Sequence, residues 1–343
     1  MSIPRNSLGS ATFSPFAGGC WMLTEGAAGM VSQVTGLARA VGLPVYKRDI
    51  HLRLPWRKMW PGLIPLWSGI FTTPLFDDGT IPPRLVISCG RQGAVGSMAL
   101  KKWLGSDVFT VHIQDPRVST SRFDLIVTPE HDGLHGPNVL HSLGAVHHIN
   151  PSLLATARAA GLTPEMSGLG EDFVAVILGG PNRYYGYSND DVSRLIQQLQ
   201  TAVATQGCRL AIVPSRRTPA AVVDRFARSF ARPHFVWQGT GQNPYLPALA
   251  FARHFVVTGD SVSMISEAAA TGRPVSVFSL TERRTAKRFR RFHQSYEQAG
   301  ITRPFDGSLP EWSYDSPDRT ASIAHEIRRA IGLVEPTNNR AAA

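Results

Sequence analysis

One short segment in the C-terminal half combines glycine, serine and carboxylate residues in an order that suits phosphate binding. An apolar run ends at Val257, and the sequence Thr-Gly-Asp-Ser-Val-Ser and an alanine-rich stretch follow it. This order predicts a strand, a tight turn and a helix that Ser261 or Ser263 caps. The free N–H groups and the dipole at the start of such a helix bind phosphate. Glu267, four residues after Ser263, shares its helix face and can accept hydrogen bonds from a ribose diol. The turn matches no nucleotide fingerprint by spacing alone, so an ordinary capped helix with a solvated glutamate stays open.

Two further pairs of residues follow other apolar runs and are candidates for contact with the same ligand. Arg216 and Arg217 come shortly after one run. Two arginines can bind a diphosphate bidentately, and each charge-assisted hydrogen bond contributes roughly 1.5–3 kcal/mol. Gly179 and Gly180 follow the run Phe173–Leu178 and permit a close approach of the backbone to a ligand. The alternative for the two arginines is a solvated basic turn, and the alternative for the two glycines is an ordinary tight turn.

The N-terminal half contains the candidate catalytic groups. His131 and Asp132 follow the apolar run at 123–127, and a general base is expected at the end of a strand. Asp132 is our candidate base, with His131 as the competing choice or as the group that orients the carboxylate, and Asp115 is next. The plain alternative is a turn in which the aspartate bonds its own backbone. Because His131, Asp132 and His135 lack a strong ligand spacing, no metal site is expected.

Two other turns in the N-terminal half are candidates for the acceptor side. Gly26 and Gly29 lie where a helix is expected to begin and run to Ala40. Arg91 and Gln92 lie in a glycine-containing turn between a predicted strand and the helix after it. Each turn is a weak signal, because glycine turns are common.

The elements that must position these residues alternate regularly along the chain. Short apolar runs bounded by glycine and proline alternate with helical stretches, which is typical of parallel βαβ units. The predicted strands are residues 85–88, 108–113, 123–127, 173–178, 210–213, 235–237, 255–257 and 275–278. Ligands bind at the carboxyl ends of strands in open α/β sheets, and the candidate residues follow such ends.

Composition indicates packed domains and an anionic partner. The chain of 343 residues fits two domains, and its 43% apolar and 17% charged residues suit α/β cores. A formal charge of +10 favours a nucleotide, an anionic lipid surface or nucleic acid. Nucleic acid is not expected, because the chain lacks finger, helix-turn-helix and aromatic-basic RNA signatures. Three dispersed cysteines argue against a disulfide framework and for a reducing compartment.

Two segments of the sequence are candidates for contact with a membrane surface. The sequence has neither a signal-peptide pattern nor a run of 18 apolar residues, so we expect a cytoplasmic protein without a transmembrane segment. Residues 46–71 interleave lysine and arginine with Trp56, Trp60 and Trp67, and residues 283–291 form a basic helical stretch. Both suit peripheral contact with anionic lipid at the inner face of the membrane. The alternatives are a buried lobe with a basic rim and a solvated helix face.

Several of these motifs together resemble those of a known family. Residues 87–92, 112–117, 123–132, 138–140, 216–219, 243–245 and 258–267 resemble the mitochondrial-fission "elongated mitochondria" family and its bacterial relatives. The resemblance runs in order over about residues 20–332. It implies a B-type glycosyltransferase fold, with two facing Rossmann-like domains and a C-terminal helix that crosses back. The plant branch is instead tied to organelle division. Residues 267–274 also resemble the donor site of the peptidoglycan N-acetylglucosaminyltransferase, which implies that Glu267 holds the ribose.

These observations predict a glycosyltransferase that uses a nucleotide-sugar as co-substrate, without a bound cofactor. The candidate nucleotide-sugar residues are Gly179, Gly180, Arg216, Arg217, Ser261, Ser263, Glu267 and, through the resemblance, Asn243. We expect an acceptor domain at 17–160, a linker at 161–172, a nucleotide-sugar domain at 173–311, a crossing helix at 312–332, and unstructured segments at 1–16 and 333–343. A lipid-linked envelope glycan is a plausible acceptor. The alternatives are a nucleotide-sugar epimerase of the same fold and a non-enzymatic scaffold at a membrane surface.

Overall fold

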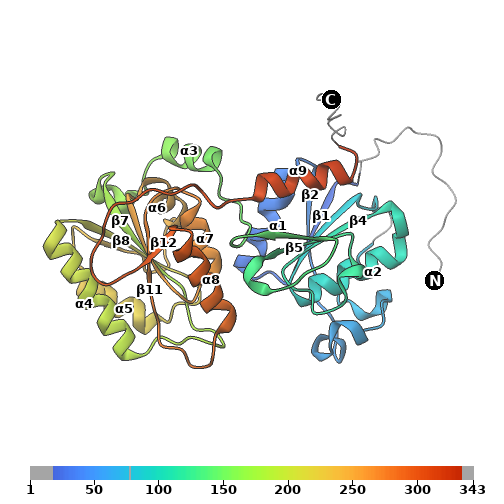
Figure 1. The fold of residues 1–343 in the computed structure, drawn as a ribbon, viewed down its shortest axis with the longest axis horizontal. Coiled ribbons are helices and arrows are strands. Elements are labelled where there is room, and N and C mark those ends of the chain that lie inside the picture. The colour runs from blue at the N-terminus through green and yellow to red at the C-terminus, as the bar shows by residue number, and fades with distance from the viewer. Residues whose placement is uncertain (1–17, 77–78, 334–343) are drawn as a thin grey trace. The chain divides into compact units, whose positions relative to one another are not determined.

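The computed structural model describes residues 18–76 and 79–333, which form two compact units (Figure 1). Among the described residues, unit 1 comprises 18–76, 79–128, 134–140 and 320–333, and unit 2 comprises Pro129–Gly133 and His141–Arg319. The predicted unstructured segments, 1–16 and 333–343, lie outside the described residues except for Leu333.

The first sheet has the strand order β2-β1-β3-β4-β5-β6. Its strands are β1 (Cys20–Thr24), β2 (Val45–Asp49), β3 (Leu85–Cys89), β4 (Phe109–Ile113), β5 (Leu125–Pro129) and β6 (Val139–Ser142), and β1 to β5 pair in parallel. Helices α1 (Ala28–Val41), α2 (Arg91–Leu104) and α9 (Thr320–Ala330) belong to the same unit. Because α9 packs on α1, the C-terminal helix returns to unit 1 as predicted, although it begins at Thr320 rather than at residue 312.

The second sheet is parallel throughout, with the strand order β12-β11-β10-β7-β8-β9. Its strands are β7 (Phe173–Leu178), β8 (Arg209–Pro214), β9 (Phe235–Val236), β10 (His254–Thr258), β11 (Val275–Phe278) and β12 (Thr302–Pro304). Its helices are α3 (Pro151–Ala160), α4 (Asn189–Gln206), α5 (Ala220–Ser229), α6 (Tyr245–Phe251), α7 (Val262–Ala269) and α8 (Lys287–Gln298). Two six-stranded sheets with flanking helices confirm the predicted α/β class with two Rossmann-like units.

Unit 2 is a three-layer sandwich whose cores follow from the alternation of side chains along its strands. Val174 and Val176 of β7 pack against α4 and α5 on one face of the sheet. Phe173, Ala175 and Ile177 point to the other face and pack with α6, α7 and α8. All six residues of β7 are buried, as an apolar run in a parallel sheet covered on both sides must be.

The segment predicted as a linker, 161–172, lies inside unit 2 instead of between the units. Its middle is a 3₁₀ helix, η7 (Pro164–Leu169), in which Met166 and Leu169 are buried in the core beside β7. Glycine and proline in this stretch therefore mark a packed irregular segment. The chain passes between the units at residues 128–141 and 319–320.

Each sheet has one point where the order of strands reverses. In the first sheet the reversal lies between β1 and β3, and in the second it lies between β7 and β10. Ligands of open α/β sheets bind in the crevice outside the carboxyl ends of the strands at such a point. The residues after Leu178 and Thr258 thus occupy the expected binding position of unit 2.

In the described part of the chain, no helix has both the length and the hydropathy that a membrane span requires.

Candidate functional site

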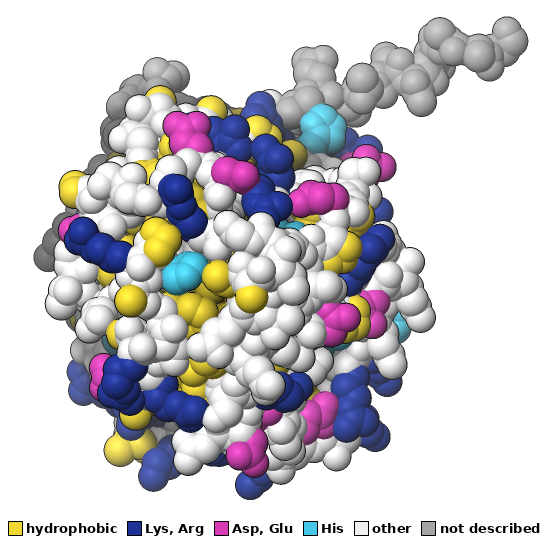
Figure 2. All heavy atoms as spheres, turned by 90° about the vertical axis from the view of Figure 1, so that its left-hand side faces the viewer, with side chains coloured by type: hydrophobic (Ala, Val, Ile, Leu, Met, Phe, Trp, Pro, Cys, Tyr) yellow, Lys and Arg dark blue, Asp and Glu magenta, His cyan; other side chains and the backbone are white. Residues whose placement is uncertain are grey.

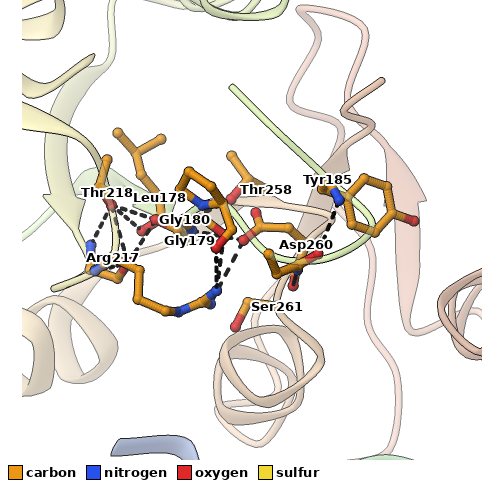
Figure 3. A network of polar contacts seen from close by, with 12 residues as sticks. Leu178, Gly179, Gly180, Tyr185, Arg217, Thr218, Thr258, Asp260 and Ser261 are labelled. Carbon is orange, nitrogen blue, oxygen red and sulfur yellow. Dashed lines mark hydrogen bonds and ion pairs between the residues drawn. The ribbon is translucent and has the colours of Figure 1, made fainter. Parts of the chain in front are cut away.

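A dense polar network fills the reversal point of the second sheet (Figure 3). The Gly179 N–H donates to Thr258 Oγ1 at 2.8 Å, and the Gly180 N–H donates to Asp260 Oδ2 at 2.7 Å. Thr218 and Ser215, after β8, donate their hydroxyl groups to the carbonyl of Gly179. Three neighbouring strand ends are thereby tied together through side chains and backbone.

Both glycines are required by close contacts rather than by backbone angles. A Cβ atom added to Gly179 would lie 2.2 Å from Asp260 Oδ2, and one added to Gly180 would lie 2.4 Å from the backbone of Arg217. Real Cβ atoms do not approach other atoms so closely. The close approach at these glycines is to the protein's own carboxylate and backbone, and their predicted approach to a ligand stays a prediction.

Asp260 is the centre of the network, and the sequence motif did not single it out. Its side chain has no exposed surface, and Arg217 Nη2 lies 3.8 Å from its Oδ2. Tyr187 donates its hydroxyl to Asp260 Oδ1 at 3.2 Å. Burial raises the pKa of the Asp260 carboxyl, and the hydrogen bond from Gly180 and the charge of Arg217 oppose that shift. Burial also raises the pKa of the Tyr187 phenol well above its usual value, so the phenol remains a donor.

Helix α7 begins beside this network with an uncapped N-terminus. Ser261 is the N-cap residue, but its hydroxyl makes no capping hydrogen bond and lies 3.5 Å from that of Ser263. The first turn of α7 contains no acidic residue. The first N–H groups and the helix dipole thus receive no side-chain cap at a position where phosphates bind, and the nearest carboxylate, Asp260, accepts its hydrogen bond from the Gly180 N–H instead.

The two arginines after β8 differ in how they are held. The Arg217 guanidinium donates to the carbonyl of Gly180 at 2.9 Å, and its side chain is 49% exposed. Arg216 is exposed, and its side chain has no polar partner among the residues that the structure describes. Arg217 is thus fixed at the network, whereas the charge of Arg216 is free to meet a ligand.

Glu267 lies further along α7 and is 5% exposed. Tyr245 donates its hydroxyl to Glu267 Oε2 at 2.5 Å, and the Tyr245 N–H donates to Asn243 Oδ1 at 2.9 Å. Burial and the neighbouring carboxylate raise the pKa of Tyr245 well above its usual value. The structure therefore brings Asn243 and Glu267 together through Tyr245, and it buries the carboxylate that we expected to meet a ribose.

The reversal point of the first sheet is organised differently, because an internal carboxylate fills it. Glu25 Oε1 accepts a hydrogen bond from the Gln92 N–H at 2.7 Å, at the start of α2. Gln92 Oε1 accepts from the Leu52 N–H, and Arg91 donates to the carbonyl of Met59 at 2.7 Å. Both predicted acceptor-side residues of this turn are thus engaged with the protein's own groups.

The other acceptor-side pair, Gly26 and Gly29, lies at the start of α1. Gly26 adopts a φ of +84° and donates its N–H to Thr24 Oγ1 at 3.0 Å. Gly29 is in the first turn of α1, whose N-cap residue, Ala27, makes no side-chain capping bond. Helices α1 and α2 both begin near this reversal point. A carboxylate accepts a hydrogen bond at the start of α2 but no side chain caps α1, so the N-terminus of α1 is the more accessible of the two to a ligand.

The candidate bases lie on two separate segments. Asp132 ends a short 3₁₀ helix, η6 (Glu130–Asp132), and its side chain is 1% exposed. Arg288 of α8 lies 2.5 Å from Asp132 Oδ1, and His131 Nε2 lies 3.5 Å from the same oxygen. Burial lowers the pKa of His131, so the imidazole is neutral at pH 7 and is a weak proton acceptor. Asp115, in contrast, is exposed and accepts a hydrogen bond from the Arg117 N–H.

No described group of three or more histidine, cysteine, aspartate or glutamate side chains has an arrangement that could hold a metal ion.

Solved structures of an epimerase and a glycosyltransferase have the same architecture. The UDP-GlcNAc 2-epimerase of Methanocaldococcus jannaschii, solved with UDP-GlcNAc and UDP, superposes with a TM-score of 0.52 over 92% of this chain and 99% of its own, at 9% identity. The glycosyltransferase of kitacinnamycin superposes with a TM-score of 0.50 over 92% of this chain and 91% of its own, at 13% identity. At such low identity these matches show the fold alone.

Sequence comparison shows the family. The Mitochondrial fission ELM1 protein of Arabidopsis thaliana is 32% identical over 73% of this chain, and the match spans 64% of the plant protein. An uncharacterized protein of Rickettsia prowazekii is 28% identical over 74% of this chain and 81% of its own length. The family model described as Mitochondrial fission ELM1 matches residues 28–331. The chain therefore belongs to the Mitochondrial fission ELM1 family.

Proposed function

We propose that this protein binds the diphosphate of a nucleotide-sugar at the carboxyl edge of the second sheet and transfers the sugar to an acceptor. The observation that carries the proposal is the uncapped N-terminus of α7 at the reversal point between β7 and β10. The N–H groups and dipole of α7 support a diphosphate site, as does Arg217, whose guanidinium lies 3.8 Å from Asp260, and we infer that the adjacent Arg216 adds a second cation. At the first sheet, by contrast, Glu25 occupies the start of α2.

The network around Asp260 supports this role by fixing the walls of the site. Asp260 accepts a hydrogen bond from the Gly180 N–H and lies beside Arg217, so its carboxylate links the loops after β7, β8 and β10. A preorganised cation near the leaving diphosphate stabilises the charge that develops on it and needs little rearrangement. Protein cations can do this work in place of a metal ion.

The family resemblance and the architecture support a nucleotide-sugar as the ligand. Structures of this fold include a glycosyltransferase and an epimerase that was solved with UDP-GlcNAc. By resemblance, Glu267 would hold the ribose. Because Glu267 is buried and accepts a hydrogen bond from Tyr245, ribose recognition by Glu267 stays a prediction.

Incubation with radiolabelled nucleotide-sugars distinguishes the proposed reaction from its rivals. A transferase releases nucleoside diphosphate and moves the label to an acceptor, whereas an epimerase changes the configuration of the sugar without an acceptor. We expect release of nucleoside diphosphate that depends on added acceptor, with Asp260→Asn as the variant that disrupts the site. Release of free epimerised sugar would favour the epimerase, which shares the fold. Binding without turnover for any donor and acceptor would favour a scaffold, the role that the name of the plant relative suggests.

A further inference from the structure

The connection between β2 and β3 in unit 1 forms an unusual surface. Parallel strands are normally joined by an α-helix. The described residues of this connection instead form three 3₁₀ helices: η1 (Trp56–Lys58), η2 (Pro61–Leu63) and η3 (Ser68–Ile70). We call residues 50–76 the tryptophan lobe, because three of the seven tryptophans of the chain lie within it.

The tryptophan lobe is firmly packed on unit 1. Its residues Ile50, Leu52, Ile64, Ile70 and Phe71 are at most 5% exposed and belong to the core of the unit. Hydrogen bonds hold its backbone from outside: α2 contributes one from Arg91 to Met59 at 2.7 Å and one from Trp103 to Leu66 at 3.2 Å. The lobe is therefore folded, and the side chains that project from it are exposed although its backbone is held in place.

Large apolar side chains project from this scaffold into solvent. Leu54 is 61% exposed, Trp60 54%, Leu63 72% and Trp67 53%. They are four of the six exposed large hydrophobic side chains among the described residues. Single exposed apolar residues are ordinary, but a cluster of them within one short segment marks an interaction surface.

The charges of the lobe have one sign. Arg53, Arg57 and Lys58 lie in it, and residues 50–76 include no aspartate or glutamate. Arg57 and Lys58 are exposed on η1, between Leu54 and Trp60. The face of unit 2 in Figure 2 is different, because cationic and anionic side chains lie interspersed on it.

We propose that the tryptophan lobe docks unit 1 on an anionic phospholipid bilayer. Tryptophan and leucine side chains would enter the boundary between headgroups and acyl chains, where amphipathic indole rings are favoured. Arg57 and Lys58 would meet the negative surface potential of the lipid. A bilayer suits this surface better than a protein partner does, because residues 50–76 contain no acidic residue and Arg57 and Lys58 form no ion pair with any residue that the structure describes. This role is independent of the nucleotide site in unit 2.

The test is co-sedimentation of the full chain with vesicles of phosphatidylcholine containing phosphatidylserine, compared with phosphatidylcholine alone. We expect binding to the mixed vesicles that falls as salt is raised, because screening weakens attraction to the surface. The double variants Trp60→Ser/Leu63→Ser and Arg57→Gln/Lys58→Gln should each lower the partition coefficient about tenfold or more. All four side chains are exposed, so the fold should persist, and circular dichroism checks it.

A matched control separates the lobe from the general positive charge of the chain. Arg228→Gln/Arg232→Gln removes two exposed cations from unit 2 and should leave the partition coefficient unchanged. An equal loss in this control would overturn the proposal, as would equal binding to both kinds of vesicle. Concentration-dependent dimers that Leu63→Ser abolishes, without vesicle binding, would assign the surface to a second copy of the chain and reject the lipid.

Discussion

Replacing Arg216 and Arg217 together by alanine should weaken the binding of a nucleoside diphosphate about a hundredfold or more and leave the binding of the nucleoside nearly unchanged. Each charge-assisted hydrogen bond to phosphate contributes roughly 1.5–3 kcal/mol, and only the diphosphate carries the charge that these residues meet. Titration calorimetry with the nucleoside diphosphate and the matching nucleoside measures both affinities.

The two single variants separate ligand contact from support of the site. Arg217 also bonds Gly180 and lies beside the buried Asp260, so its loss changes the network itself. Arg216 has no polar side-chain partner in the described part of the chain, so Arg216→Ala reports on the ligand alone. Arg228→Ala, an exposed cation on α5, is the control and should have no effect. If the affinities for the diphosphate and the nucleoside fall equally, Arg216 and Arg217 support only the structure of the turn and do not contact the ligand.

Replacing Asp132 by asparagine should lower turnover at least about a hundredfold, the low end of what a general base contributes, while donor affinity stays nearly constant. Asparagine keeps the size of the side chain and removes its ability to accept a proton. The measurement is single-turnover transfer at saturating donor, with donor affinity from calorimetry in parallel.

Arg288 provides the control that this prediction needs, because Asp132 is buried beneath it. Arg288→Gln keeps the carboxylate, so turnover should survive if Asp132 acts as the base. If Asp132→Asn and Arg288→Gln lose turnover and thermal stability alike, the ion pair is structural and the base lies elsewhere. Loss of turnover in His131→Gln alone would assign the base to the histidine. If none of these changes matters, Asp115→Asn is the next variant, because Asp115 is exposed at the end of β4.

The strands that were predicted have an apolar signal of their own, but β1, whose five residues are all buried, was missed as well. Phe173–Leu178 and Val275–Phe278 have the predicted bounds, since every residue of each strand is buried. β2 was missed because its five residues, VYKRD, form a half-exposed edge strand with little apolar content. β12 was missed because it is only three residues long.

Helix starts were predicted too early where basic or aromatic residues lie before the helix. The basic stretch from residue 283 becomes helical only at Lys287. The C-terminal helix begins at Thr320, and Tyr314, in the irregular segment before it, donates its hydroxyl to the carbonyls of Ala269 and Arg273. Such tertiary contacts are not encoded in local sequence pattern.

The candidate site was only partly predictable, because its centre depends on strand order. The glycine, arginine and serine motifs each follow a strand, and the structure places Gly179, Gly180 and Arg217 in one network with Ser261 beside it. Asp260 was missed as the central residue, because its partner Gly180 is 80 residues away and the adjacency of β7 and β10 cannot be read from either motif. The ion pair between Asp132 and Arg288 was missed because its two residues are likewise far apart in the sequence.

Thermal unfolding in the presence of nucleoside diphosphates tests the central claim most directly. The measurement compares diphosphates of each common base with the corresponding nucleosides and needs no knowledge of the sugar or acceptor. At a hundred times its dissociation constant, a ligand that binds only the folded state stabilises it by about 2.7 kcal/mol. We predict that at least one nucleoside diphosphate raises the unfolding temperature accordingly, and that Arg216→Ala reduces the shift. If no nucleoside diphosphate changes the unfolding temperature and calorimetry detects no binding, the edge of the second sheet is not a nucleotide-sugar site.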